Sequence, residues 1–172
     1  HAFSFFRFLR LDGDRNKPFI LEPNEKFIVG CLFGWKNKAG LRRFTTAYIE
    51  IGKGGGKTPL VAGMGLYGTM ADNAQAAEIY AAAVTREQAH ILFQDAKNMA
   101  EQSPEIAKHL DIGEHNIAYK PTLSFFRPIS SEGRSLDAKR IHFGLIDEIH
   151  EHRTDIVVNK IDLGKKGRKQ PL

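Results

Sequence analysis

Residues 44–58 read FTTAYIEIGKGGGKT, and this stretch decides how the rest of the chain is interpreted. The apolar, β-branched run over residues 44–51 predicts a buried strand, and a glycine-rich turn with two lysines follows at once. Residues without a Cβ let successive backbone N–H groups point into one concavity, which then binds anions. The pattern is typical of a phosphate-binding loop, in which Lys57 contacts the β- and γ-phosphates of ATP and the Thr58 hydroxyl holds Mg²⁺.

The loop is a variant of the pattern G-x-x-x-x-G-K-[ST], because Ile51 stands where the first glycine falls. Lys53 adds a second cation that the pattern does not require. A flexible glycine linker with two solvated lysines is the alternative, but the predicted strand before it and the apolar residues after it favour a phosphate loop. The residues expected to bind the nucleotide are Gly52, Lys53, Gly54, Gly55, Gly56, Lys57 and Thr58.

A second part of the site is expected about 90 residues further on. The run IHFGLI at 141–146 predicts another buried strand, and Asp147 and Glu148 follow it directly. Two acids beside a core are costly unless a cation lies opposite. In phosphate-loop ATPases that cation is Mg²⁺, so we assign Asp147 to the metal and Glu148 to the attacking water, which it orients or deprotonates.

The segments between these two motifs predict alternating helices and strands. A helix is expected from Thr58 to about Met70, a strand over 77–84, and a helix opened by the capping box of Thr85 and Gln88. Two short strands over 116–129 and a polar loop over 130–140 follow. The apolar face of the second helix consists of Ala89, Leu92, Phe93, Ala96, Met99 and Ala100. This order indicates an α/β fold with a mostly parallel sheet flanked by helices.

Glycines, an amphipathic segment and a run of phenylalanines give further expectations. Gly63, Gly65 and Gly68 disfavour a helix and therefore suggest close packing against a sheet. Pro23 marks the start of a helix whose apolar face is expected to hold Phe27, Ile28, Cys31 and Leu32. On that helix Glu25 is placed to read the adenine edge, and an ordinary exposed glutamate is the alternative. Phe3, Phe5, Phe6 and Phe8 are expected to form a packed strip.

Composition limits the class of protein. The chain has 172 residues, 42% of them apolar, and a single cysteine, Cys31, which favours a reducing compartment. No segment suits a membrane span or a cleavable signal, so we expect a soluble protein. Residues 153–172 carry +4 of the formal charge of +5 and could meet DNA phosphates or form a solvated loop. His150, Glu151 and His152 lack the H-E-x-x-H spacing of a zinc site.

The motifs together resemble the ATPase half of the large terminase subunit of tailed bacteriophages. The resemblance runs from about Phe3 to the end of the chain and depends on four stretches: LEPNEKFIVGCLFGW (21–35), IEIGKGGGKT (49–58), EIYAAAVTREQAHILFQDAKNM (78–99) and HFGLIDEIHEH (142–152). It implies a three-layer phosphate-loop NTPase fold of the ASCE/RecA-like type, forming one ATPase domain over 1–172 with an N-terminal extension (1–20) and a basic tail (153–172).

The resemblance also implies residue roles. Lys57 and Thr58 bind phosphate and Mg²⁺, Asp147 binds the metal and Glu148 is catalytic. Lys53 stands where the family has a loop arginine and joins Lys57 and Glu148 as a catalytic candidate. Asn24 and Glu25 stand where the family usually has a tryptophan followed by the glutamine that contacts adenine, and His150 ends a D-E-x-H box.

For the whole protein the resemblance implies a Mg-ATP-driven motor that packages double-stranded DNA into a prohead in the host cytoplasm. The motor would be a homo-oligomeric ring that works with a portal protein and a small terminase subunit, away from any membrane. A coupling motif and a nuclease domain are expected beyond Leu172, so no DNA cleavage is expected from this chain. Two alternatives are a helicase-like D-E-x-H ATPase and a non-enzymatic basic module that binds nucleic acid.

Overall fold

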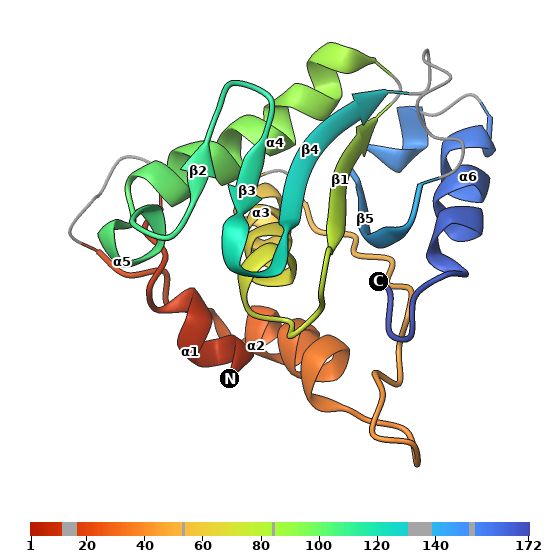
Figure 1. The fold of residues 1–172 in the computed structure, drawn as a ribbon, viewed down its shortest axis with the longest axis horizontal. Coiled ribbons are helices and arrows are strands. Elements are labelled where there is room, and N and C mark those ends of the chain that lie inside the picture. The colour runs from red at the N-terminus through yellow and green to blue at the C-terminus, as the bar shows by residue number, and fades with distance from the viewer. Residues whose placement is uncertain (12–16, 53, 84, 131–138, 152–153) are drawn as a thin grey trace.

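The computed structural model describes residues 1–11, 17–52, 54–83, 85–130, 139–151 and 154–172 (Figure 1). The helices are α1 (Ala2–Phe6), α2 (Pro23–Val29), which continues as a π-helix (Gly30–Gly34), α3 (Lys57–Met70), α4 (Arg86–Glu101), α5 (Pro104–Ala107) and α6 (Ile156–Lys165), with 3-10 turns at Lys120–Thr122 and Ile149–Glu151. The strands are β1 (Glu78–Ala83), β2 (Asp111–Ile112), β3 (Ile117–Tyr119), β4 (Ser124–Ser130) and β5 (Ile141–Ile146). None of the described helices has the length and apolar composition that a bilayer span needs.

The strands form one mixed sheet in the order β2-β3-β4-β1-β5. β1 pairs in parallel with β4 and β5, whereas β2, β3 and β4 pair antiparallel. The helices α3 and α4 cover one face of the sheet and α6 covers the other (Figure 1). The α/β prediction is therefore confirmed, with the parallel strands confined to the three positions β4, β1 and β5.

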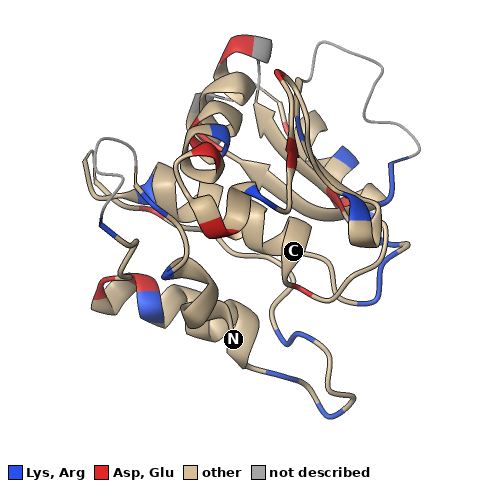
Figure 2. Ribbon diagram, turned by 60° about the vertical axis from the view of Figure 1, so that its left-hand side comes forward, with Lys and Arg blue, Asp and Glu red and all other residues tan. Residues whose placement is uncertain are grey.

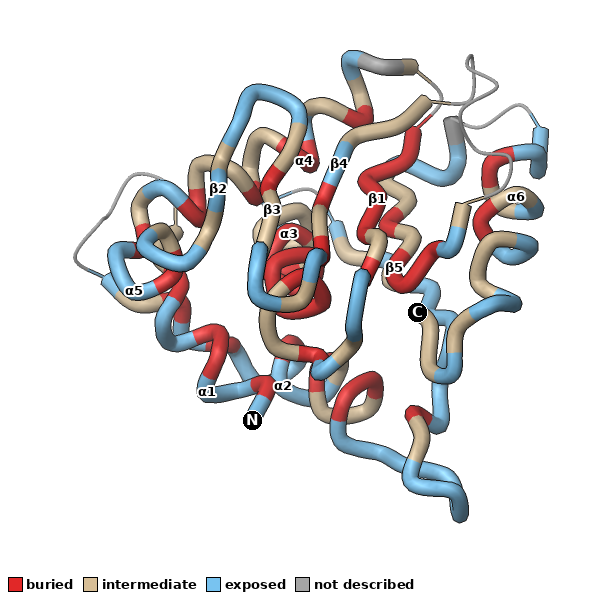
Figure 3. Tube along the Cα trace, viewed as in Figure 1, coloured by how far each residue is buried: buried red, intermediate tan, exposed pale blue. Residues whose placement is uncertain are grey.

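The alternation of side chains along β1 produces two cores. Ile79 and Ala81 face α3 and α4, whereas Tyr80 and Ala82 join Val157 and the rest of the cluster under α6. This is the period of two that a strand buried on both faces requires. Figure 3 shows the resulting concentration of buried residues in α3, β1 and β5.

The helix α4 follows its sequence prediction closely. The Thr85 hydroxyl accepts from the backbone N–H of Gln88 (3.2 Å), and the Gln88 side chain accepts from the N–H of Thr85 (3.3 Å). This capping box satisfies two donors that would otherwise lack partners. All six predicted apolar positions are buried, and the helix ends at Glu101, before Ser103 and Pro104.

The glycines of α3 are sites of close contact, as predicted. A Cβ at Gly65 would lie 2.5 Å from the ring of Phe126 on β4, and one at Gly68 would lie 2.5 Å from the ring of Phe143 on β5. The glycine at position 63 instead faces Phe6 of α1 at 2.6 Å. These glycines let α3 approach both the sheet and the N-terminal helix.

Replacing Gly68 with alanine is expected to destabilise the fold. The added methyl overlaps the Phe143 ring, which is fully buried and cannot move aside freely, so overpacking costs about 1–3 kcal/mol and outweighs a helix-propensity gain of about 1 kcal/mol. Urea unfolding measures the difference. Gly34→Ala is the control, because a Cβ at Gly34 meets nothing within 4 Å. An equal or higher stability of Gly68→Ala would contradict the close packing.

The prediction of a strand over residues 44–51 is wrong. This segment is extended and exposed, with Phe44 37% and Tyr48 72% accessible, and it belongs to no ladder of the sheet. Leu172, and not the predicted strand, pairs with the outer edge of β5. Its N–H donates to His142 O (2.8 Å), and its carbonyl accepts from Gly144 N (2.9 Å). Because strand propensity reflects packing against neighbours, a strand-like pattern without a partner forms no ladder.

The buried face of α2 agrees with the prediction at Leu32 and differs from it at Phe27. Phe27 is 72% exposed, while Ile28 and Cys31 are only partly buried. The buried positions are Glu25, Val29, Leu32 and Phe33, spaced i, i+4, i+7 and i+8 as one face of a helix requires.

In the N-terminal strip Phe5 and Phe6 of α1 are buried, whereas Phe3 on the same helix and Phe8 in the turn after it are exposed.

Candidate functional site

Three glycines of the predicted phosphate loop occupy positions where a side chain would be strained or would clash. Gly54 and Gly56 adopt φ of 81° and 79°, the left-handed region that favours glycine. A Cβ at Gly55 would lie 2.3 Å from Ile51 Cγ2, so a side chain has no room there. The N–H of Gly55 donates to the carbonyl of Gly52 at 3.0 Å, which closes the turn.

The loop leads straight into the N-terminus of α3. Gly56 is the N-cap of this 14-residue helix and provides no side-chain cap, so the first backbone N–H groups of the helix lack a capping side chain. The helix dipole adds a partial positive charge at the same place. This loop and helix start therefore form an environment suited to phosphate groups.

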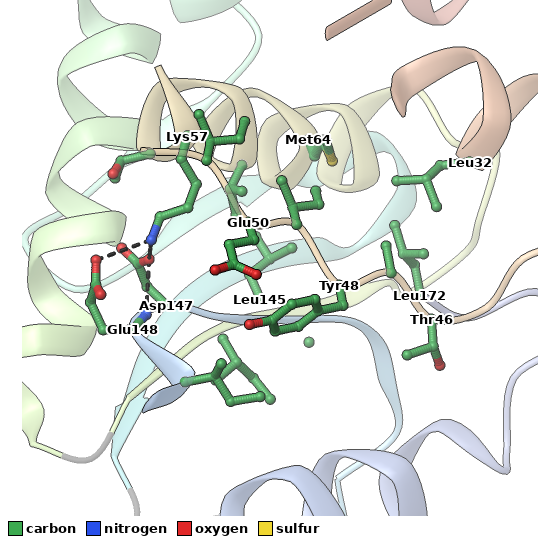
Figure 4. Close-up of a pocket in the computed structure, with 18 of the residues that line it drawn as sticks. Leu32, Thr46, Tyr48, Glu50, Lys57, Met64, Leu145, Asp147, Glu148 and Leu172 are labelled. Carbon is green, nitrogen blue, oxygen red and sulfur yellow. Dashed lines mark hydrogen bonds and ion pairs between the residues drawn. The ribbon is translucent and has the colours of Figure 1, made fainter. Parts of the chain in front are cut away.

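Lys57 meets both predicted acids, although 90 and 91 residues separate them in the chain. Its Nζ lies 3.2 Å from Asp147 Oδ1 and 3.1 Å from Glu148 Oε1 (Figure 4). The three side chains are 26%, 20% and 45% exposed, so solvent and a ligand can reach them. The structure thus places the glycine loop and the N-terminus of α3 beside the carboxyl end of β5.

The ion pairs shift the ionisation of their members in opposite directions. The hydrogen bond to Glu148 raises the pKa of Lys57, and the same bond lowers the pKa of Glu148. The stability that Glu148 adds to the folded state is present above the pKa of this group in the unfolded chain, and it is lost as the pH falls through the lowered pKa of the folded state. The stability that Lys57 adds is present below the pKa of this group in the unfolded chain, and it is lost as the pH rises through the raised pKa of the folded state. Both groups are therefore charged throughout the neutral range.

Glu148 has an uncommon backbone conformation, with φ of 46° in the left-handed region. Its N–H donates to the Asp147 carboxylate at 3.0 Å, and its Oε2 lies 3.3 Å from His150 Nδ1. A non-glycine residue at such a φ is costly and persists where the surroundings impose it, commonly at functional sites. The geometry directs the Glu148 carboxylate toward Lys57 and the phosphate loop.

A cavity of about 1010 Å³ opens next to these side chains (Figure 4). Its walls are the phosphate loop with the first turn of α3, the end of β5 with Asp147 to His150, the extended residues 46–52, and α6. The volume is that of a site for a nucleotide-sized ligand. Tyr48 and Glu50 also line the cavity, and they were not predicted from the sequence because their segment was expected to be a buried strand.

Of the remaining residues predicted for the site, Thr58 lines the cavity and Glu25 does not. Thr58 is half-buried and lines the cavity. Glu25 is 6% exposed and is not among the lining residues of the described chain. Its Oε2 accepts from the N–H of Glu22 at 2.7 Å, and its Oε1 would lie 3.3 Å from a Cβ at Gly56. Lys53 and His152 lie outside the described residues.

A buried polar cluster stabilises the neighbouring structure, and sequence reasoning missed it. Arg42 donates to both carboxylate oxygens of Asp72 at 2.7 Å, and its guanidinium lies 5.1 and 4.9 Å from the rings of Phe33 and Phe143. Asp72 also contacts His142 Nε2 at 2.7 Å. The cluster joins the segment before the phosphate loop to the end of α3 and to β5.

Comparison with known families agrees with this geometry. A family model described as the ATPase domain of the terminase large subunit matches residues 23–172. The chain belongs to this terminase family. Membership implies ATPase activity, confirms the resemblance drawn from the motifs and disfavours the helicase-like alternative.

One solved structure extends the comparison to three dimensions. This terminase domain is similar to the crystal structure of the large terminase of bacteriophage HK97, with a TM-score of 0.85 and 24% sequence identity. The match covers 99% of this chain and 36% of that protein, so the chain spans little more than a third of the length of the HK97 terminase. At this identity the likeness establishes the fold. The comparison with curated proteins gave no match.

Proposed function

We propose that this domain hydrolyses ATP with Mg²⁺ and that, within the full-length terminase, hydrolysis drives double-stranded DNA into a prohead. One observation carries the proposal: the phosphate loop and the acid pair after β5 meet at Lys57, with distances of 3.2 and 3.1 Å. A lysine of the loop and two acids at a strand end are the parts that phosphate-loop ATPases use.

In this proposal the backbone N–H groups of the loop, from Gly52 to Thr58, surround the phosphates. Lys57 leaves the carboxylates and pairs with the phosphates, where it offsets charge that develops during transfer. Glu148, kept ionised by its surroundings, orients the attacking water and accepts its proton. Lys53 is a second cation of the loop, and Glu25 supports Gly56 from the side of α2 and is the candidate for an adenine contact.

The residues present suit Mg²⁺, and the Asp147 carboxylate and Thr58 hydroxyl would hold it. Both offer the hard oxygen ligands that Mg²⁺ prefers, and the two acids already enclose a cation, the Lys57 ammonium. In the described part of the chain no group of three His, Cys, Asp or Glu is arranged as a metal cage. Mg²⁺ in phosphoryl-transfer sites commonly takes one or two protein ligands and completes its shell with phosphates and water. When bound, it polarises the phosphates.

The proposal extends to the assembly. Phosphate-loop motors commonly complete their sites with an arginine from a neighbour, so we propose a ring of copies on the prohead, together with a portal protein and a small terminase subunit in the host cytoplasm. Residues 1–172 act as the ATPase domain, and DNA cleavage belongs to other parts of the protein.

Binding of Mg-ATP should raise the melting temperature of the full-length protein. A ligand that binds only the folded state at 100 times its dissociation constant adds about 2.7 kcal/mol to the free energy of unfolding. Differential scanning fluorimetry with Mg-ATP, ATP plus EDTA, and Mg²⁺ alone measures the shift and its metal dependence. The alternative of a non-enzymatic nucleic-acid-binding module predicts no shift with any of these additions, and that result would refute the ATPase proposal.

A further inference from the structure

A rigid hairpin projects from the molecule just before the phosphate loop. Trp35 O accepts from Arg43 N (3.0 Å), and Asn37 N donates to Leu41 O (2.8 Å) across its two arms. The Asn37 side chain accepts from the N–H groups of Ala39 and Leu41 at 2.9 and 3.1 Å, which fixes the tip. At its base Arg42 is buried and paired with Asp72. The hairpin over 35–44 therefore holds its shape in solvent.

The exposed surface of this hairpin is basic. Lys36, Lys38 and Arg43 are all exposed, and the sequence holds no Asp or Glu between Lys26 and Glu50. Figure 2 shows the hairpin as a projection with basic residues and without acidic ones. A solvated hairpin without a function would normally mix both signs of charge.

The fold brings the basic end of the chain to the same place. Lys165 Nζ donates to Thr45 O (3.1 Å) and lies 3.2 Å from Thr46 Oγ1, directly after the hairpin. The guanidinium of Arg42 donates to Gln170 O at 2.8 Å. The exposed Lys166 and Lys169 lie in the segment between these two contacts. Two basic segments that are about 125 residues apart in sequence thus form one surface.

Aromatic side chains accompany this charge. Trp35 is 55% exposed and lies 5.9 Å from the ring of Phe44, with the Arg43 guanidinium 5.9 Å from both rings. Trp35 and Phe44 therefore present apolar ring surface to solvent beside a cationic side chain. Arginine and aromatic groups side by side offer phosphate contacts together with apolar contacts to sugars or bases.

We propose that the hairpin 35–44 and the adjoining residues 165–169 form a surface that binds the phosphate backbone of double-stranded DNA. This inference rests on the proposed packaging function and names the place where the motor contacts its substrate. The excess of positive charge favours a polyanion over a protein surface. Its principal contacts are Lys36, Lys38, Arg43, Lys166 and Lys169.

The position of this surface also suggests how DNA binding reaches the ATP site. The hairpin continues directly into the extended residues 46–52, which line the cavity beside the phosphate loop. That segment belongs to no ladder of the sheet and is held instead by the bonds of Lys165 to Thr45 and Thr46 and by the packing of Ile49 against the core. The hairpin is therefore connected to the cavity wall through the backbone of residues 45–52, and to the end of α3 through the pair of Arg42 with Asp72.

A charge-removal experiment in the full-length protein tests the surface. In the triple variant Lys36→Ala, Lys38→Ala, Arg43→Ala, the plot of log K for duplex DNA against log salt concentration is expected to lose about 2–3 in slope, because each phosphate contact contributes about 0.9. The matched control is Lys26→Ala, Lys108→Ala, Lys120→Ala, which removes three exposed charges elsewhere and should leave the slope nearly unchanged. Circular dichroism checks that both variants melt as the parent does.

Each result has one reading. An unchanged slope in the hairpin variant, or an equal loss in the control, overturns the proposed surface. Loss of oligomer assembly with DNA binding unchanged assigns the hairpin to a protein partner and also overturns it. The thermal shift with Mg-ATP is measured in parallel on the parent protein and the hairpin variant. No shift in the parent protein would refute the ATPase proposal. A shift in both proteins, together with an unchanged DNA slope in the variant, refutes only the DNA surface.

Discussion

Replacing Glu148 with glutamine is expected to lower ATP turnover by about 10²- to 10⁴-fold while nucleotide binding persists. The substitution keeps the size of the side chain and its hydrogen-bonding capacity but removes the negative charge that accepts a proton from water. Asp147 still lies 3.2 Å from Lys57, so the loop keeps one of its two ion pairs in the nucleotide-free state. DNA-stimulated phosphate release in the full-length protein measures turnover, and the thermal shift with Mg-ATP measures binding.

A control within the same cavity distinguishes a catalytic carboxylate from a merely adjacent one. Glu50 lines the same cavity from the extended segment, and the ion pairs of Lys57 in the described chain are with Asp147 and Glu148, so Glu50→Gln makes the same chemical change without removing a Lys57 ion pair (Figure 4). We expect its turnover to stay close to that of the parent protein. Parental turnover in Glu148→Gln, or an equal loss in both variants, would remove the general-base assignment.

The sequence specified the parts of the fold in which local signals and tertiary packing agree. In α4 the capping box of Thr85 and Gln88 and the apolar positions describe the same helix, and the structure contains it. For β5 the six-residue run IHFGLI coincides with the strand, because its length suits a buried strand and is too short for a typical buried helix. The approach of Asp147 to Lys57 follows from the placement of these elements.

Predictions failed where a pattern depended on a partner that the pattern itself does not contain. The strand-like residues 44–51 have no neighbour to pair with, so they lie exposed along the cavity. For α2 the face was misjudged because Glu25 counted as polar and therefore exposed, whereas its carboxylate is buried against Glu22 and Gly56. The cluster of Arg42, Asp72 and His142 was missed because residue type alone does not distinguish a buried polar side chain from an exposed one.

Replacing Lys57 with alanine is expected to abolish both nucleotide binding and turnover. In the proposed site this lysine supplies the main side-chain charge for the β- and γ-phosphates, and removal of one charged stabiliser of a transition state costs about 10²- to 10³-fold in rate, beyond the loss of binding. The thermal shift with Mg-ATP should disappear. Lys26→Ala, an exposed lysine on the neighbouring α2, should leave binding and turnover unchanged.

The same variant changes the nucleotide-free protein in a way that only the observed ion pairs predict. Lys57 is the first cause of the lowered pKa of Glu148, so in Lys57→Ala that pKa should rise toward the ordinary glutamate value, which an NMR titration of Glu148 would follow. Lys57→Arg keeps the charge beside the acids and should preserve the lowered pKa, although a planar guanidinium is a poor substitute for a compact ammonium at the phosphates. If turnover fell in Lys57→Ala while the Glu148 titration stayed unchanged, the lysine would bind phosphate but would form no ion pair with Glu148 in the nucleotide-free protein. If both stayed unchanged, the loop and the acids would not form one site.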